Sequence, residues 1–309
     1  MAVTRMRFTG TGAGTHYIDL AKAISLQERR LHRQKKIYTV YGGFFVDTPA
    51  SGDVSRVNLN TAPNTWVSRL AVNRAFRIWK KMVAKTIADA DGSKPGKYND
   101  FKIYLNNSHG ATPLLPVDAA GNNLYITAPE WDYSTLTSED RFEDPATGVT
   151  QAVDQFELNL VGHSNPNGQD QNTPTGWSRV GVIDSWLNSR PTVDSNNPED
   201  IPNSATVRTP DPLSNLFDSG DADDDRVAIM ETEGDQPPYD ESSMFGMVSS
   251  TTTGDHNLQR VSVATTTPDQ PTAPIHGFSA LCGLVQVEVT SANAAWELVL
   301  DVETVGEAF

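Results

Sequence analysis

The feature that most limits the possible folds is the alternation of short β-like runs with long polar connections after residue 97. Connections such as residues 163–176 and 190–212 are rich in Asn, Asp, Gly, Pro, Ser and Thr. Strands separated by turn residues are typical of a sandwich or barrel, whereas a βα fold needs a helix between successive strands. The expected strands are Phe101–Leu105, Leu124–Thr127, Gln155–Val161, Trp177–Trp186, Val227–Glu231, Arg260–Thr265, Leu284–Thr290 and Trp296–Glu303.

The last two of these runs alternate most regularly. Apolar residues occupy every second position of both, at Val285, Val287 and Val289 and then at Trp296, Leu298, Leu300 and Val302. Because they are adjacent in sequence, we expect them to pair with each other.

The first ninety residues have a different character. Residues 1–16 are rich in Gly and Thr, and we expect them to form a mobile or partner-dependent arm. A helix is predicted from Asp19, as its cap, to about Lys36, with Leu20, Ile24 and Leu31 on one stripe. Cations crowd its second half, at Arg29, Arg30, Arg33, Lys35 and Lys36. The helix dipole accounts for two or three of them, so a nucleic-acid backbone is the alternative partner.

A strand is expected over Ile37–Val46, with Val40, Phe44 and Val46 on one side and Phe45 on the other. Gly42-Gly43 within this strand indicates a bulge or a close approach of another backbone. A turn and a second short strand, Val54–Leu59, follow.

The clearest helix is expected over residues 66–88, capped by Asn64 or Thr65. Its predicted buried stripe is Val67, Leu70, Ala71, Ala75, Ile78 and Met82. Its opposite side carries Arg69, Asn73, Arg77 and Lys81, flanked by Lys80 and Lys85. Such a row is either a solvated helix face or a surface for a genome or an acidic neighbouring subunit.

Charge is divided unevenly along the chain. Residues 1–105 contain 18 of the 24 Lys and Arg but only 7 of the 39 Asp and Glu, a net charge of +11, while residues 106–309 carry −26. A basic segment can contact phosphate while an acidic remainder stays solvated. The alternative is that the two parts neutralise each other inside the fold.

Signatures of catalysis are missing from the sequence. The six histidines form no HxH or HExxH pair and are expected at the surface, and no Gly-x-Ser-x-Gly or Walker-type loop occurs. Cys282 is the single cysteine and is expected to be a buried small residue. We therefore expect no enzyme and no cofactor.

Two acidic segments leave alternatives open. Asp221, Asp223 and Asp225 have a spacing that suits Ca²⁺, but Arg226 and Thr232 break the EF-hand pattern. A looser Ca²⁺ site between subunits remains possible, beside the simpler interpretation as an exposed acidic loop. Glu130-Trp131-Asp132-Tyr133 places acids beside aromatic rings, which suits a sugar-binding or glycoside-acting protein.

Five stretches of the chain carry a resemblance to a known family: residues 19–25, 29–34, 37–40, 60–66 before the basic helix, and Gly283-Leu284. They resemble the corresponding parts of jelly-roll major capsid proteins of small tailless DNA viruses with single-stranded genomes. The similarity covers about the first 90 residues and the C-terminal strands. It implies a single or double jelly roll whose many copies assemble into an icosahedral shell, the virion, around a DNA genome.

The resemblance implies an arm and basic helix over residues 1–36 and a shell domain over residues 37–309 with helix 66–88 inserted. A dense basic tail is absent, since only Arg5 and Arg7 precede the first helix. The expected inner contacts to genome or internal membrane are therefore Arg29, Arg30, Arg33, Lys35, Lys36, Arg69, Arg77 and Lys81. Rival hypotheses are a phage fibre, spike or glycan-binding β-module, a glycoside-acting enzyme, and a tailed-phage capsid protein of another fold.

Overall fold

The computed structural model describes residues 3–89, 96, 98–124, 131–137, 142–143, 150–151, 155–162, 179–188, 258–290 and 295–307. By its contacts the chain divides into one unit of Met1–Asn188 with Phe245–Phe309 and a second unit, Ser189–Met244, which lies outside the described residues.

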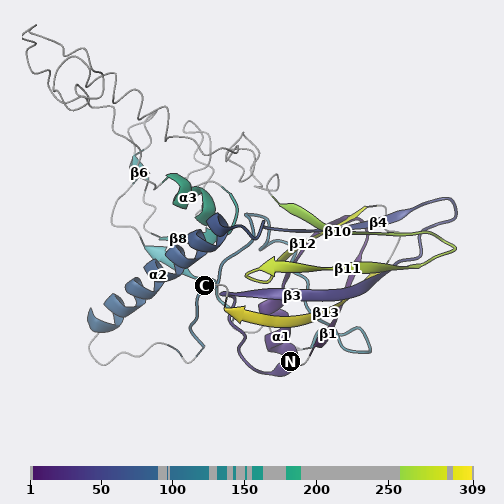
Figure 1. Ribbon diagram of the computed structural model, residues 1–309, viewed down its shortest axis with the longest axis horizontal. Helices are drawn as coiled ribbons and strands as arrows, with labels where there is room; N and C mark the ends of the chain where they lie inside the picture. The colour runs from purple at the N-terminus through teal and green to yellow at the C-terminus, as the bar shows by residue number, and fades with distance from the viewer. Residues whose placement is uncertain are drawn as a thin grey trace, which may run out of the picture. The chain divides into compact units, whose positions relative to one another are not determined.

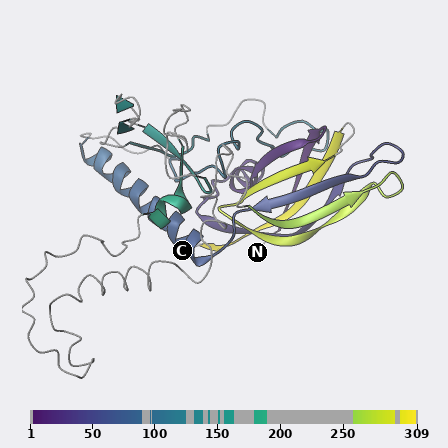
Figure 2. The same cartoon turned by 90° about the horizontal axis from the view of Figure 1, so that it is seen from above.

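Most of the ordered secondary structure is β-sheet, as the turn-separated runs predicted. Two four-stranded antiparallel sheets lie face to face (Figures 1 and 2). Sheet A has the strand order β1 (Thr4–Thr11), β13 (Ala295–Glu307), β3 (Lys36–Val46), β11 (Thr272–Leu281). Sheet B has the order β10 (Gln259–Thr266), β4 (Ser55–Thr61), β12 (Leu284–Thr290), β2 (Gly14–Asp19).

The other elements are shorter or helical. The three helices of the described residues are α1 (Leu20–Glu28), α2 (Trp66–Asp89) and α3 (Val182–Asn188). The remaining strands are β5 (Thr135–Thr137), β6 (Phe142–Glu143), β7 (Thr150–Gln151), β8 (Gln155–Asn159) and β9 (Arg179–Gly181). The two helices expected in the first third are present, and α3 was not expected.

One hydrophobic core fills the space between sheets A and B. Alternation in each strand puts apolar side chains inward and polar ones outward. In β13, Trp296, Leu298 and Leu300 are buried, and in β12, Val285 and Val287 are buried in the same cluster. The expected pairing of β12 with β13 is therefore wrong: they belong to different sheets and contribute side chains to one core.

A second core joins the long insertion between β4 and β10 to one end of the sandwich. Val67, Ala71 and Val72 of α2 are buried there with Phe101 and Ile103. The turn between β11 and β12 contributes Leu281, Cys282 and Leu284 to the same cluster. Cys282 is buried as expected.

Residues 3–16 are not a mobile arm. Residues 4–11 pair along their whole length with β13, and residues 14–19 pair with β12. Few residues of this segment are apolar, but Met6 and Phe8 are both buried in the main core and so hold β1 in the sandwich.

The first helix ends well before Lys36. Asp19 caps it through a hydrogen bond from the Lys22 amide, as expected, but Arg29 adopts a left-handed conformation (φ 53°) and ends it. The chain must turn here because Gln34 is buried and hydrogen-bonds to both backbone groups of Ile103. Arg30 and Arg33 consequently lie in a non-helical link.

The glycine pair in β3 behaves as the sequence indicated. The register with β13 shifts by one residue between Gly42 and Val40, which leaves Tyr41 as an extra residue. The shift reverses the alternation, so Val40 and Phe45 both face the core, contrary to the expected sides.

Other expected strands have mixed outcomes. Residues 155–159, 260–265 and 284–290 are strands, as predicted, while residues 227–231 and 125–127 lie outside the described residues. Residues 101–105 make only an isolated parallel bridge, between Tyr104 and Asn159, because the Lys102 and Leu105 amides donate to the side chains of Ser134 and His109. Residues 179–188 form a short strand followed by α3.

Candidate functional site

The most distinctive charged surface lies on α2. Between Trp66 and Ala88 the helix contains six cations and no carboxylate, and all six side chains are exposed. We call this surface the α2 basic face: Arg69, Arg74, Arg77, Lys80, Lys81 and Lys85. At 3.6 residues per turn, the six positions fall within about 160° of the helix circumference, so the cations share one broad side of the helix. The predicted basic row is thus confirmed and extended by Arg74.

The other side of α2 explains why this face points outward. Val67, Ala71, Val72 and Ala75 are buried in the second core. Thr65 caps the helix, since its Oγ1 accepts a hydrogen bond from the Ser68 amide over 3.2 Å. The cap sets where α2 begins, and the buried residues set which side of the helix faces the core.

Three large apolar side chains lie exposed on the same helix. Leu70 and Ile78, expected in the buried stripe, are 44% and 47% exposed, and Trp66 is 55% exposed. The predicted burial is wrong for Leu70 and Ile78, because Val72 and the half-buried Phe76 and Trp79 take the inward positions instead. The α2 basic face therefore has apolar groups among its cations, and Trp66 packs edge-on against Trp186 of α3.

The predicted cations of the α1–β3 link are only partly joined to this surface. Lys35 lies with its Nζ 4.0 Å from the centre of the Phe76 ring, which brings the link against α2. Arg33 Nε lies 3.6 Å from Oδ2 of Asp100. Arg29 and Arg30 are exposed at the end of α1, and Lys36 is the first, half-buried residue of β3.

Arg5 and Arg7 lie on the outer face of sheet A and are neutralised there. Arg5 forms an ion pair with Asp301, and Arg7 forms one with Glu297, each over 2.7 Å. The hydrogen bond from Arg5 lowers the pKa of the Asp301 carboxyl. Mutual neutralisation, one of the two alternatives for the charge pattern, therefore applies to this face, whereas Arg77, Lys80 and Lys81 of α2 form no ion pair among the described residues.

The acidic candidates receive little support from the described part of the chain. Asp221, Asp223, Asp225 and Glu130 lie outside it. Within it, no group of three or more His, Cys, Asp or Glu side chains could hold a metal ion. Trp131 is no open platform for a sugar, because its Nε1 donates to Asp19 and its ring lies under Lys102.

Sequence reasoning missed the buried polar residues. His109, expected at the surface, is 1% exposed and stacks on Tyr17, and burial lowers its pKa to about 3. Burial raises the pKa of Asp19 to about 6. The sequence does not reveal this burial, because it depends on neighbours that are distant in the chain.

No protein-family model, no curated protein and no solved structure matches this chain. None of the helices in the described residues has the length and apolar character needed to span a membrane.

Proposed function

We propose that this protein is the shell-forming subunit of a small tailless DNA virus, built on a single jelly roll and assembled in many copies around the genome. The proposal rests on one observation above all, the way the eight strands of sheets A and B pair.

These eight strands pair in nested order. Counted along the chain, the first pairs with the last (β1 with β13), the second with the seventh (β2 with β12), the third with the sixth and the fourth with the fifth. This is the pattern of a long hairpin rolled into two sheets, the arrangement of jelly rolls in viral shells and lectins. One set of eight strands supports a single roll, with residues 62–258 as its insertion between the fourth and fifth strands.

The distribution of charge supports a shell whose inner and outer surfaces differ in charge. The α2 basic face carries cations without carboxylates, so it suits a phosphate backbone or another anionic surface on the inside of a shell. The outer face of sheet A carries paired charges of both signs, which suits water or a neighbouring subunit. An internal membrane in place of the genome is the alternative partner of the basic face.

Assembly is the test. Purified full-length protein should form closed, uniform particles in electron micrographs, with a matching hydrodynamic size by light scattering. Monomers under all salt conditions would overturn the proposal. Trimers that bind glycans would favour the fibre or spike hypothesis instead, and turnover of a glycoside would favour an enzyme.

A further inference from the structure

The outer face of sheet B is polar, yet much of it is buried. In β4, Val57 and Leu59 face the core while Asn58 and Asn60 face outward, and in β12 Gln286 faces outward. These three amide side chains are only 5–9% exposed. Buried amides need fixed hydrogen-bond partners, so this face is a built polar surface and not a merely solvated one.

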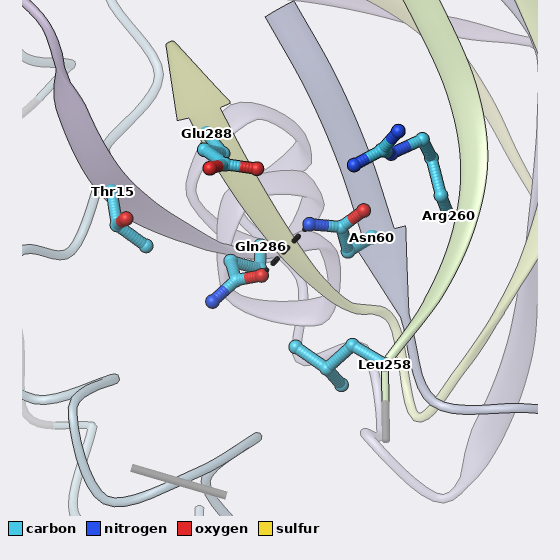
Figure 3. Close-up of a pocket in the computed structure, with 6 residues that line it drawn as sticks. All are labelled: Thr15, Asn60, Leu258, Arg260, Gln286 and Glu288. Carbon is cyan, nitrogen blue, oxygen red and sulfur yellow. Dashed lines mark hydrogen bonds between the residues drawn. The ribbon is translucent and has the colours of Figure 1, made fainter. Parts of the chain in front are cut away.

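One row of side chains crosses all four strands. Tyr17, Gln286, Asn60 and Arg260 lie opposite one another in successive strands. Asn60 Nδ2 donates to Gln286 Oε1 over 2.9 Å, and Gln286 Nε2 donates to the Tyr17 hydroxyl over 3.3 Å. The bond to Gln286 fixes the Asn60 amide so that its oxygen points toward the side of Arg260 (Figure 3).

A second, shorter row lies beside the first. Glu288 is opposite Thr15 of β2 and Asn58 of β4. Asn58 Nδ2 donates to Glu288 Oε2 over 3.1 Å, which positions the carboxylate and leaves Oε1 available. Arg260, exposed at the edge strand, has no ion pair among the described residues.

Residues of the two rows line an open pocket of about 270 Å³. Its lining is Thr15, Asn60, Leu258, Arg260, Gln286 and Glu288 (Figure 3). One cation and one carboxylate balance the charge, so a neutral ligand fits better than a phosphate, which Glu288 would repel. Leu258 is the single aliphatic side chain among the described lining residues, so this part of the pocket does not suit an apolar ligand.

The polar groups offer both donors and acceptors at close range. The guanidinium of Arg260 donates, whereas Glu288 Oε1 and Asn60 Oδ1 accept. The hydroxyls of a sugar ring both donate and accept, so adjacent hydroxyls can satisfy all three groups. We propose that this pocket binds one neutral sugar ring, such as the terminal residue of a glycan.

The experiment uses the full-length protein and simple methyl glycosides of mannose, galactose, fucose and N-acetylglucosamine as probes, followed by saturation-transfer NMR. At least one should bind with a Kd of roughly millimolar size, as expected for a few hydrogen bonds to a single ring. Glu288→Gln and Arg260→Ala should each weaken it about tenfold, the size expected for one lost charge-assisted hydrogen bond.

Arg56→Ala is the matched control. Arg56 is an exposed cation on β4 that lies outside the pocket lining, so its replacement should leave glycoside binding unchanged. Thermal melting checks that each variant is folded. The proposal is overturned if no glycoside binds, or if Glu288→Gln and Arg260→Ala bind like the wild type. Particle formation is read from the same samples by electron microscopy, so failure here is distinguishable from failure of the shell proposal.

Discussion

Gln34 donates a hydrogen bond from Nε2 to Oδ2 of Asp19 over 3.1 Å, although both residues are buried. Gln34 also donates to the Ile103 carbonyl and accepts from the Ile103 amide. One side chain thus joins the start of α1, the link before β3 and the beginning of the buried segment at residue 101. Since both backbone groups of Ile103 bond to it, Gln34 adds polar contacts to the second core where the sandwich meets the insertion.

Replacing Gln34 tests that dependence. Gln34→Ala leaves the buried N–H and C=O of Ile103 without their side-chain partner and removes one of the hydrogen bonds to Asp19, so we expect a loss of about 3 kcal/mol in the free energy of unfolding. Chemical denaturation measures it. Gln27→Ala is the control, because Gln27 makes a single exposed bond to the Arg5 carbonyl and should change stability by under about 0.5 kcal/mol. Equal effects of the two variants would contradict this interpretation.

Asp19 should make the protein less stable as the pH rises, because its pKa is higher in the folded state than in the unfolded state. Burial raises its pKa from 3.8 to about 6 in the folded protein, so the folded state holds a proton that the unfolded state has released. The stabilisation from this proton is full below pH 4 and is lost as the pH rises through 6. Relative to wild type, Asp19→Asn should therefore gain roughly 3 kcal/mol between pH 4 and pH 7.

The comparison with Asp19→Asn is essential because His109 acts in the opposite sense. Its pKa is lowered by burial to about 3, so its contribution is present above pH 6.5 and is lost as the pH falls toward 3. The wild-type profile alone mixes both effects. Denaturation curves of wild type and variant at each pH isolate Asp19, and a constant difference between the two would count against a raised pKa.

Gly43 tests how closely the strands of sheet A approach each other. A Cβ at this position would lie 1.9 Å from the backbone oxygen of Val299, whereas at Gly42 the nearest atom would be 3.3 Å away. Gly43→Ala must displace β13, so we expect a loss of about 3 kcal/mol or more. Gly42→Ala should cost clearly less, and Gly96→Ala, which meets open space, should stay within about 0.5 kcal/mol. Urea denaturation gives the order, and any other order would contradict the close approach.

The sequence could predict the parts of the fold that local chemistry determines. Alternating apolar residues predicted β3, β4, β10 and β12, and the cap at Thr65 with the periodic residues after it predicted α2. Gly42-Gly43 correctly indicated a local irregularity, because a glycine in a strand marks a bulge or the close approach of another backbone.

Features that depend on distant partners could not be predicted in this way. β11 escaped notice because Pro274 and Gly277 weaken its strand pattern, which an edge strand tolerates. The early end of α1 depends on Gln34 meeting Ile103, sixty-nine positions away. The pocket on sheet B combines residues of four strands, from Thr15 to Glu288, and no stretch of sequence contains it.

The α2 basic face allows a prediction about binding of polyanions. Arg77 and Lys81 are exposed, lie one helical turn apart and have no ion pair among the described residues. If both contact phosphates of single-stranded DNA, Arg77→Ala with Lys81→Ala removes two contacts, and the slope of log affinity against log salt should fall by about 1.4. Fluorescence anisotropy with a labelled oligonucleotide at several salt concentrations measures this slope.

The matched control removes two cations that the fold already neutralises. Arg5→Ala with Arg7→Ala changes net charge by the same amount, but these side chains are occupied by Asp301 and Glu297 on sheet A. If binding followed net charge alone, both double variants would weaken it equally, and α2 would have no special role. If it follows the α2 basic face, only the Arg77 and Lys81 pair changes the salt dependence, because those two guanidinium and ammonium groups are the ones that can release counterions from the nucleic acid.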